Sequence, residues 1–214
     1  MNNYQSKRER MVESQIEDRG IRDKKVLQAM RSVPRHLFLP EGAREFAYAD
    51  YPVRIGNGQT ISQPYIVALM TELLNVKQGQ RVLDVGTGSG YQAAILAELT
   101  SDVHTIERYP DLAKNAEATL SSLGYDRVQV HEGDGTLGYP PAAPYDRIIV
   151  TAASPSVPEA LLSQLADKGR LVIPVGSQHL QHLEVWERKR GQLQHDTSIA
   201  VVFVPLIGEQ GWDG

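Results

Sequence analysis

The chain contains no cysteine among its 214 residues. That absence excludes a disulfide framework, a thiolate nucleophile and a metal site built on sulfur. Long hydrophobic runs are also missing, and the N-terminal stretch MNNYQSKRERMVESQIEDR is polar and charged, unlike a signal peptide. We therefore expect a cytoplasmic protein that has no membrane partner.

The sequence also lacks an excess of positive charge. Lys and Arg number 22 against 26 Asp and Glu, which gives a formal net charge of −4. Nucleic-acid binding draws much of its affinity from clustered basic side chains, so this balance disfavours nucleic acid as a partner. No heptad pattern indicates association between helices, and we expect a monomer.

Two regions of different periodicity form what we expect to be a single domain, residues 1–214. Residues 1–75 favour helices, with Gly20 suited to end a first helix and Asp23 suited to cap a second. Residues 76–214 alternate short apolar runs with helical stretches, which is typical of βαβ units and a parallel sheet.

The second region supplies most of the predicted fold. Predicted strands span 81–86, 103–107, 127–131, 146–151 and 170–175, and predicted helices span 91–99, 110–123 and 157–168. The C-terminal residues predict an antiparallel strand pair with a turn near Gly191. The fold class is therefore α/β: a Rossmann-like, doubly wound, mostly parallel sheet of seven strands, with N-terminal helices and a C-terminal antiparallel pair.

A glycine-rich turn, DVGTGSG, joins the first predicted strand of this region to a helix. Gly86, Gly88 and Gly90 allow the backbone to bend tightly and allow a ligand to approach without a Cβ in the way. A merely flexible turn is the alternative. The order of strand, glycines and helix favours a nucleotide-like ligand.

The residues around the glycines restrict the ligand. In a dinucleotide-binding fingerprint the third glycine stands one residue later, where this chain has Tyr91. Asp84 precedes the glycines, and a carboxylate there would repel a pyrophosphate but suits a cationic ammonium or sulfonium group. S-adenosyl-L-methionine carries both cations.

Further acidic residues follow the next two predicted strands. Glu107 ends the second strand, where a carboxylate can accept hydrogen bonds from both hydroxyls of a ribose. Asp134 and Gly135 follow the third strand, near the expected position of an adenine edge. Because open α/β sheets bind ligands at the carboxyl ends of their strands, three acids placed there favour one shared site.

This arrangement resembles the class I S-adenosylmethionine-dependent methyltransferases. The segments GQTISQPYIVALMTELL, GDG, PYDRIIVTAA, LLSQLADKGRLVIPVG and VVFVPL are similar to motifs of the protein-L-isoaspartate O-methyltransferase family. The resemblance runs from about residue 20 to residue 206. It implies methyl transfer from S-adenosyl-L-methionine, with S-adenosyl-L-homocysteine as product, to the α-carboxylate of L-isoaspartyl residues in damaged proteins and peptides, which begins their repair.

The resemblance also implies roles for individual residues. Ser62 matches the active-site serine of the family, and Thr60 and Ile61 match neighbours that line the pocket. Val204 and Pro205 match a peptide-docking edge strand. Residues 1–75 then carry the substrate loop, and residues 76–214 form the cofactor-binding core.

Other interpretations of these residues remain open. Ser62 or Gln63 could simply cap the helix that Pro64 begins, a contribution of about 1 kcal/mol. Tyr65 occupies a position where an aromatic ring can lie near the cofactor. His179 and His182 form an H-x-x-H pair, but no further ligand stands at metal spacing, and we expect no metal.

Rival functions also remain. A class I methyltransferase acting on RNA or a small molecule would share the glycine loop but not TISQPY or VVFVPL. A nicotinamide-dependent oxidoreductase conflicts with Asp84 and the glycine spacing. A non-catalytic binding module could keep the fold.

Overall fold

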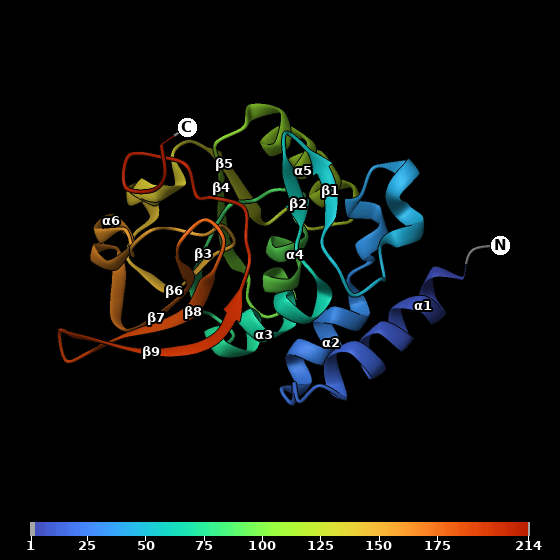
Figure 1. Ribbon diagram of the computed structural model, residues 1–214, viewed down its shortest axis with the longest axis horizontal. Helices are drawn as coiled ribbons and strands as arrows, with labels where there is room; N and C mark the ends of the chain where they lie inside the picture. Colours follow the sequence, from blue (N-terminus) through green and yellow to red (C-terminus); the bar gives the residue numbers. More distant parts are fainter. Residues whose placement is uncertain (1–2, 214) are drawn as a thin grey trace.

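The computed structural model describes residues 3–213, in which a seven-stranded sheet has the strand order β5-β4-β3-β6-β7-β8-β9 (Figure 1). The strands are β3 (Arg81–Val85), β4 (Asp102–Glu107), β5 (Val128–Glu132), β6 (Tyr145–Val150), β7 (Leu165–Gly176), β8 (Gln181–Lys189) and β9 (Gln192–Val201). The strands from β5 to β7 pair in parallel, whereas β8 and β9 are antiparallel. The predicted Rossmann-like fold is confirmed, including its C-terminal antiparallel pair.

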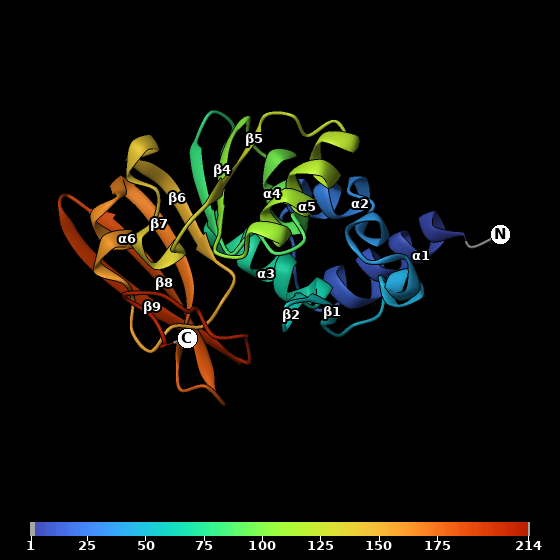
Figure 2. The ribbon, with the colours of Figure 1, turned by 90° about the horizontal axis from the view of Figure 1, so that it is seen from above.

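Alternating side chains give the sheet two buried faces. Val82 belongs to the larger core cluster, which also holds residues of the N-terminal helices, while its neighbour Leu83 belongs to a smaller cluster with Leu161. Three further helices contribute to the larger cluster: α3 (Pro64–Leu74), α4 (Tyr91–Ala97) and α5 (Pro110–Ser122). In Figure 2 these three helices lie between the sheet and the N-terminal helices.

The N-terminal region follows the predicted helix boundaries. Helix α1 (Tyr4–Arg10) continues as the π-helix η1 (Met11–Glu17), and Gly20 then takes a φ of 103°. The Asp23 carboxylate accepts a hydrogen bond of 2.8 Å from the Lys25 N–H and so caps α2 (Lys24–Ser32). Two 3-10 helices follow, η2 (Arg35–Phe38) and η3 (Glu41–Phe46).

A β-hairpin that the sequence analysis missed leads into α3. Its strands are β1 (Val53–Gly56) and β2 (Gln59–Ile61), which pair in antiparallel fashion. Asn57 and Gly58 form the turn, with φ values of 48° and 71°. An Asn-Gly pair is a strong hairpin signal because both residues tolerate positive φ, so the sequence did carry the information.

The predicted helix over 157–168 is wrong in its second half. Helix α6 spans only Glu159–Ser163, and β7 begins at Leu165. The Gln164 carbonyl accepts the Tyr145 N–H at 2.8 Å, and Leu165 is buried opposite Tyr145 in the sheet. Pairing with β6 therefore overrides the helical propensity of the segment. Two short 3-10 helices lie nearby. They are η4 (Gly135–Leu137), which contacts α6, and η5 (Pro140–Ala142), whose Ala142 packs against the smaller cluster.

Candidate active site

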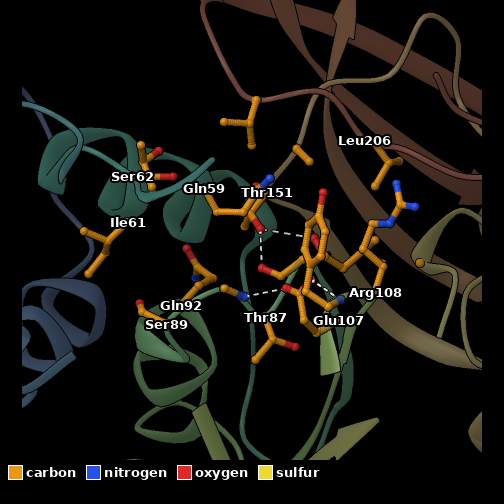
Figure 3. Close-up of a pocket in the computed structure, with 18 of the residues that line it drawn as sticks. Gln59, Ile61, Ser62, Thr87, Ser89, Gln92, Glu107, Arg108, Thr151 and Leu206 are labelled. Atoms are coloured by element: carbon orange, nitrogen blue, oxygen red, sulfur yellow. Dashed lines mark hydrogen bonds between the residues drawn. The ribbon is translucent and has the colours of Figure 1, made fainter. Parts of the chain in front are cut away.

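A cavity opens at the carboxyl ends of β3, β4 and β6, with about 800 Å³ of empty space, part of it open to solvent. Figure 3 shows Ile61 and Ser62 on one side of it and Glu107 and Arg108 on the opposite side. We call this space the cofactor cavity.

The glycine loop forms the floor of the cofactor cavity. The N–H groups of Gly86 and Thr87 both donate to the Ile106 carbonyl, at 2.9 and 3.2 Å. Gly86 has a φ of 97°, and a Cβ there would lie 2.8 Å from the Thr151 hydroxyl oxygen. Gly88 and Gly90 also have positive φ, and Gly90 stands at the N-cap of α4. The loop therefore requires glycine for both its conformation and its packing.

Glu107 lies at the end of β4 and lines the cofactor cavity. One carboxylate oxygen accepts the Gly88 N–H at 2.9 Å, and the other accepts the Tyr109 N–H at 3.0 Å. These bonds fix the orientation of the carboxylate. Each oxygen can still accept a further hydrogen bond, because a carboxylate offers about four lone-pair positions.

Asp84 lies beneath the glycine loop rather than in the lining of the cavity. Its side chain is completely buried and one oxygen accepts the Thr105 hydroxyl at 2.9 Å, whereas Oδ1 has no hydrogen-bond partner among residues 3–213. Burial raises the pKa of Asp84 to about 8, and the nearby Glu107 adds to this shift. The carboxyl group therefore favours its neutral form at neutral pH until a positive charge approaches.

Asp134 holds the C-terminal segment instead of lining the cavity. One oxygen accepts the Thr136 N–H and hydroxyl at 2.8 and 2.7 Å, and the other accepts the Glu209 N–H at 2.7 Å. Burial acts to raise the pKa of Asp134, but the hydrogen bonds from Glu209 and Thr136 lower it below the usual value. Gly135 and Ile207 do line the cofactor cavity on this side.

A second cavity meets the first beside Ser62. It is an apolar groove whose lining includes Ile66, Leu180 and the segment 200–204. Val202 and Leu180 are 72% and 53% exposed there. Four residues line both cavities, and we call them the junction: Thr60, Ser62, Thr151 and Val204.

Ser62 and Gln63 do not cap α3. Gln63 is the N-cap residue, but no described side chain makes a capping hydrogen bond there, and the Gln63 amide donates to the Asp50 carbonyl at 3.1 Å. The capping interpretation of Ser62 is therefore wrong. The hydroxyl of Ser62 is left available at the junction.

The remaining predicted residues divide between the cavities and the packing around them. Thr60, Ile61 and Pro205 line the cofactor cavity. The Tyr65 side chain lies elsewhere: its ring centroid is 3.6 Å from the Arg19 guanidinium carbon, and it packs against the larger core cluster.

Several lining residues were not anticipated. Thr151 follows β6, and its hydroxyl donates to the Gly86 carbonyl at 2.8 Å. Thr151 stands at the carboxyl end of a central parallel strand, and this position in the sequence could have predicted that it lines the site. Arg108 and Tyr109 follow Glu107 directly, whereas nothing in the sequence distinguished Gln92 or Ile207.

Two features are absent from residues 3–213: a membrane-spanning helix and a cluster of metal-binding side chains. No described helix is both long and apolar enough to span a bilayer. Within the same residues, no group of three or more metal-binding side chains comes together.

Comparisons with known proteins point to one family, and the similarity extends along nearly the whole chain. The model of the family described as protein-L-isoaspartate(D-aspartate) O-methyltransferase matches residues 6–211. A protein-L-isoaspartate O-methyltransferase of Methanoregula boonei is 58% identical over 96% of this chain and 95% of its own. A protein-L-isoaspartate O-methyltransferase 1 of Syntrophobacter fumaroxidans is 52% identical over the full length of both chains.

Solved structures show the same relationship. One protein-L-isoaspartate O-methyltransferase superposes with a TM-score of 0.84 at 27% identity, over 95% of this chain and 67% of its own. A structure from Plasmodium falciparum, in complex with S-adenosyl-L-homocysteine, superposes with a TM-score of 0.83 at 30% identity, over 97% of this chain and 99% of its own.

Proposed function

The chain belongs to the protein-L-isoaspartate O-methyltransferase family, and on this premise we propose that it methylates the α-carboxylate of L-isoaspartyl residues in damaged proteins and peptides. The methyl donor is S-adenosyl-L-methionine. The ester then closes to a succinimide, whose hydrolysis returns part of the damaged sites to aspartate. The observation that carries the proposal is the junction, where the cofactor cavity beside the glycine loop and an apolar groove share Ser62 in their linings.

The residues around the cofactor cavity fit S-adenosyl-L-methionine. The glycine loop admits close approach, and Glu107 keeps free lone pairs for ribose hydroxyls. The orphaned oxygen of Asp84 supports a polar, cationic ligand above it. We assign Gly86, Gly88, Gly90 and Gly135 to the same site. When bound, S-adenosyl-L-methionine supplies the methyl group.

Ser62 is proposed as the catalytic residue that orients the acceptor. A carboxylate with a pKa of about 3 to 4 is already ionised at neutral pH, so no general base is needed. The task of the protein is to align and desolvate that carboxylate, and good alignment is worth several kcal/mol. The Ser62 hydroxyl donates to a carboxylate oxygen in this proposal, with Thr60 and Ile61 beside it.

The peptide is proposed to lie along the groove. Val204 and Pro205 continue beyond β9, and the Val204 carbonyl already accepts the Ala153 N–H at 2.8 Å. Main-chain pairing along such an edge accepts many sequences, because side chains contribute little to it. The enzyme should therefore accept many different residues next to the isoaspartyl residue, as a general repair enzyme must.

Partners and location are part of the proposal. The net charge of −4 supports an enzyme without a nucleic-acid partner. We propose that it acts as a monomer in the cytoplasm on proteins and peptides. Light scattering of the purified chain tests the monomer, since a dimer would double the measured mass.

The rival is a class I methyltransferase that acts on RNA or a small molecule. One assay separates the two functions: incubation with methyl-labelled S-adenosyl-L-methionine and paired peptides containing isoaspartate or aspartate, followed by mild base. We expect volatile methanol from the isoaspartyl peptide alone, because only a carboxyl methyl ester hydrolyses under these conditions. A base-stable product, or equal methanol from both peptides, would contradict the proposal.

A further inference from the structure

Arg35 is a fully buried arginine that holds the backbone of the junction. It stands at the start of η2, and its side chain is 0% exposed. Its Nε donates to the Ala47 carbonyl at 2.7 Å, and its Nη2 donates to the Ser62 carbonyl at 2.7 Å. The guanidinium therefore ties Ser62, two residues before α3, to the irregular N-terminal segment.

The charge of Arg35 has no counterion among residues 3–213. No described carboxylate lies within ion-pair distance of it, and its buried Nη1 has no hydrogen-bond partner. Desolvation lowers the pKa of Arg35 to about 10, so the side chain is still cationic at neutral pH. Its guanidinium carbon lies 4.9 Å from the centroid of the Tyr91 ring, which lines the cofactor cavity.

Such an arrangement is costly for folding alone. A buried charge without a partner destabilises a protein, and an apolar side chain would fill the same space without that penalty. A buried cation becomes useful when an anion must bind nearby, because the interior screens their attraction poorly. The substrate of the proposed reaction brings a carboxylate to Ser62, whose carbonyl Arg35 holds.

We propose that Arg35 is a positioning residue for methyl transfer: it fixes the backbone of Ser62 and sets an uncompensated positive charge behind the place where the substrate carboxylate binds. This inference rests on the proposed function. The tie to the Ser62 carbonyl acts on the orientation of the hydroxyl, and hence on kcat. The charge acts on the affinity for the anionic acceptor, and hence on the KM of the peptide.

Arg147 offers a matched control within the same chain. It is 8% exposed and makes no ion pair with a described residue, and desolvation also lowers its pKa. Its guanidinium donates to backbone carbonyls, those of Asn75 at 3.2 Å and Asp146 at 2.7 Å. None of these residues lines either cavity. Arg147 is therefore another largely buried arginine that donates to backbone carbonyls, although less deeply buried than Arg35, and it lies away from the site.

The test compares Arg35→Lys, Arg35→Met and Arg147→Met for kcat, the KM of the isoaspartyl peptide, the Kd of S-adenosyl-L-methionine and the melting temperature. Arg35→Lys keeps the charge but not the paired donors, so kcat falls about tenfold while KM stays near wild type. Arg35→Met also raises KM by about tenfold or more. The Kd stays within about twofold of wild type in both, and Arg147→Met lowers only the melting temperature.

A double-mutant cycle separates a positioning role from a structural one. In a Ser62→Ala background, Arg35→Lys should no longer lower kcat, because the tie acts through Ser62. An equal loss of kcat in both backgrounds, or an unchanged kcat in Arg35→Lys, overturns the inference. In both backgrounds the cycle uses Arg35→Lys, which keeps a positive charge at this position. The cycle therefore does not require that Arg35→Met folds. Absence of methanol from the wild-type enzyme would instead overturn the proposed function.

Discussion

The two halves of the site are built in different ways. The cofactor half, formed by the glycine loop and Glu107, is held by loop N–H groups that donate to the Ile106 carbonyl and to the Glu107 carboxylate at the end of β4. The acceptor half, formed by residues 60–62 and 200–205, is held to the N-terminal segment by a side chain, and it exposes apolar residues in an open groove. Because of this difference, we expect that substitutions can change the binding of S-adenosyl-L-methionine and the methylation of the peptide separately.

Removing the Ser62 hydroxyl is the strongest test of that separation. In Ser62→Ala we expect kcat to fall about 10²-fold, because a preorganised hydrogen-bond donor is lost where the carboxylate must be aligned. The Kd of S-adenosyl-L-methionine, measured by calorimetry, should hardly change. Unchanged turnover would remove the serine from the mechanism, and a parallel loss of cofactor affinity would break the distinction between the halves.

Gly86→Ala should do the reverse. The new Cβ would lie 2.8 Å from the Thr151 hydroxyl at a φ of 97°, so the loop must shift. A backbone strain of about 1–3 kcal/mol predicts a Kd for S-adenosyl-L-methionine that is about tenfold weaker or more. Gly124→Ala is the control, since Gly124 also has positive φ, at 81°, but an added Cβ there would meet no atom of residues 3–213 within 4 Å. Its affinity should match wild type while its stability falls.

The pKa of Asp84 predicts a pH effect confined to the cofactor half. Burial holds this pKa at about 8, and a cationic sulfonium favours the ionised form, so binding below pH 8 must release a proton. The affinity for S-adenosyl-L-methionine should therefore rise up to about tenfold between pH 7 and pH 9. S-adenosyl-L-homocysteine, whose sulfur is neutral, should show a smaller rise. Asp84→Asn should remove the difference; an identical slope in that variant would assign the effect to another group.

The smallest expected effect concerns the groove. Val202→Asp places a charge on an apolar wall, and we expect the peptide KM to rise about threefold to tenfold as apolar contact is lost. Ile199→Asp is the matched control, because Ile199 on β9 is also an exposed apolar residue but lies outside the groove. Equal kinetics for the two variants would exclude this wall from peptide binding.

The strand and the glycine loop of the cofactor half could be predicted from the residues alone, for a physical reason. The run of Arg81–Val85 and the glycines after it are local signals, since strand propensity and positive φ depend on adjacent residues. The short α6 was misjudged because Leu165 pairs with Tyr145 across the sheet. Sequence spacing alone carries no information on that pairing.

Contacts between segments that are distant in the sequence explain the other differences between the predicted and the observed site. Asp134 stood at the expected strand end, but its oxygens bind Thr136 and the Glu209 N–H, 75 residues away. Arg35 looked like an ordinary basic residue in an irregular stretch. Only the packed structure reveals that it is buried and joined to Ser62.

The hydrogen bond between Asp134 and the C-terminal segment has a practical consequence. Ile207 forms part of the cofactor wall, and the Gln210 N–H bonds to the Thr136 hydroxyl at 3.1 Å. An affinity tag or a truncation at this end would disturb ligand binding before it disturbed folding. Purification handles therefore belong ahead of α1, on the far side of the molecule (Figure 1).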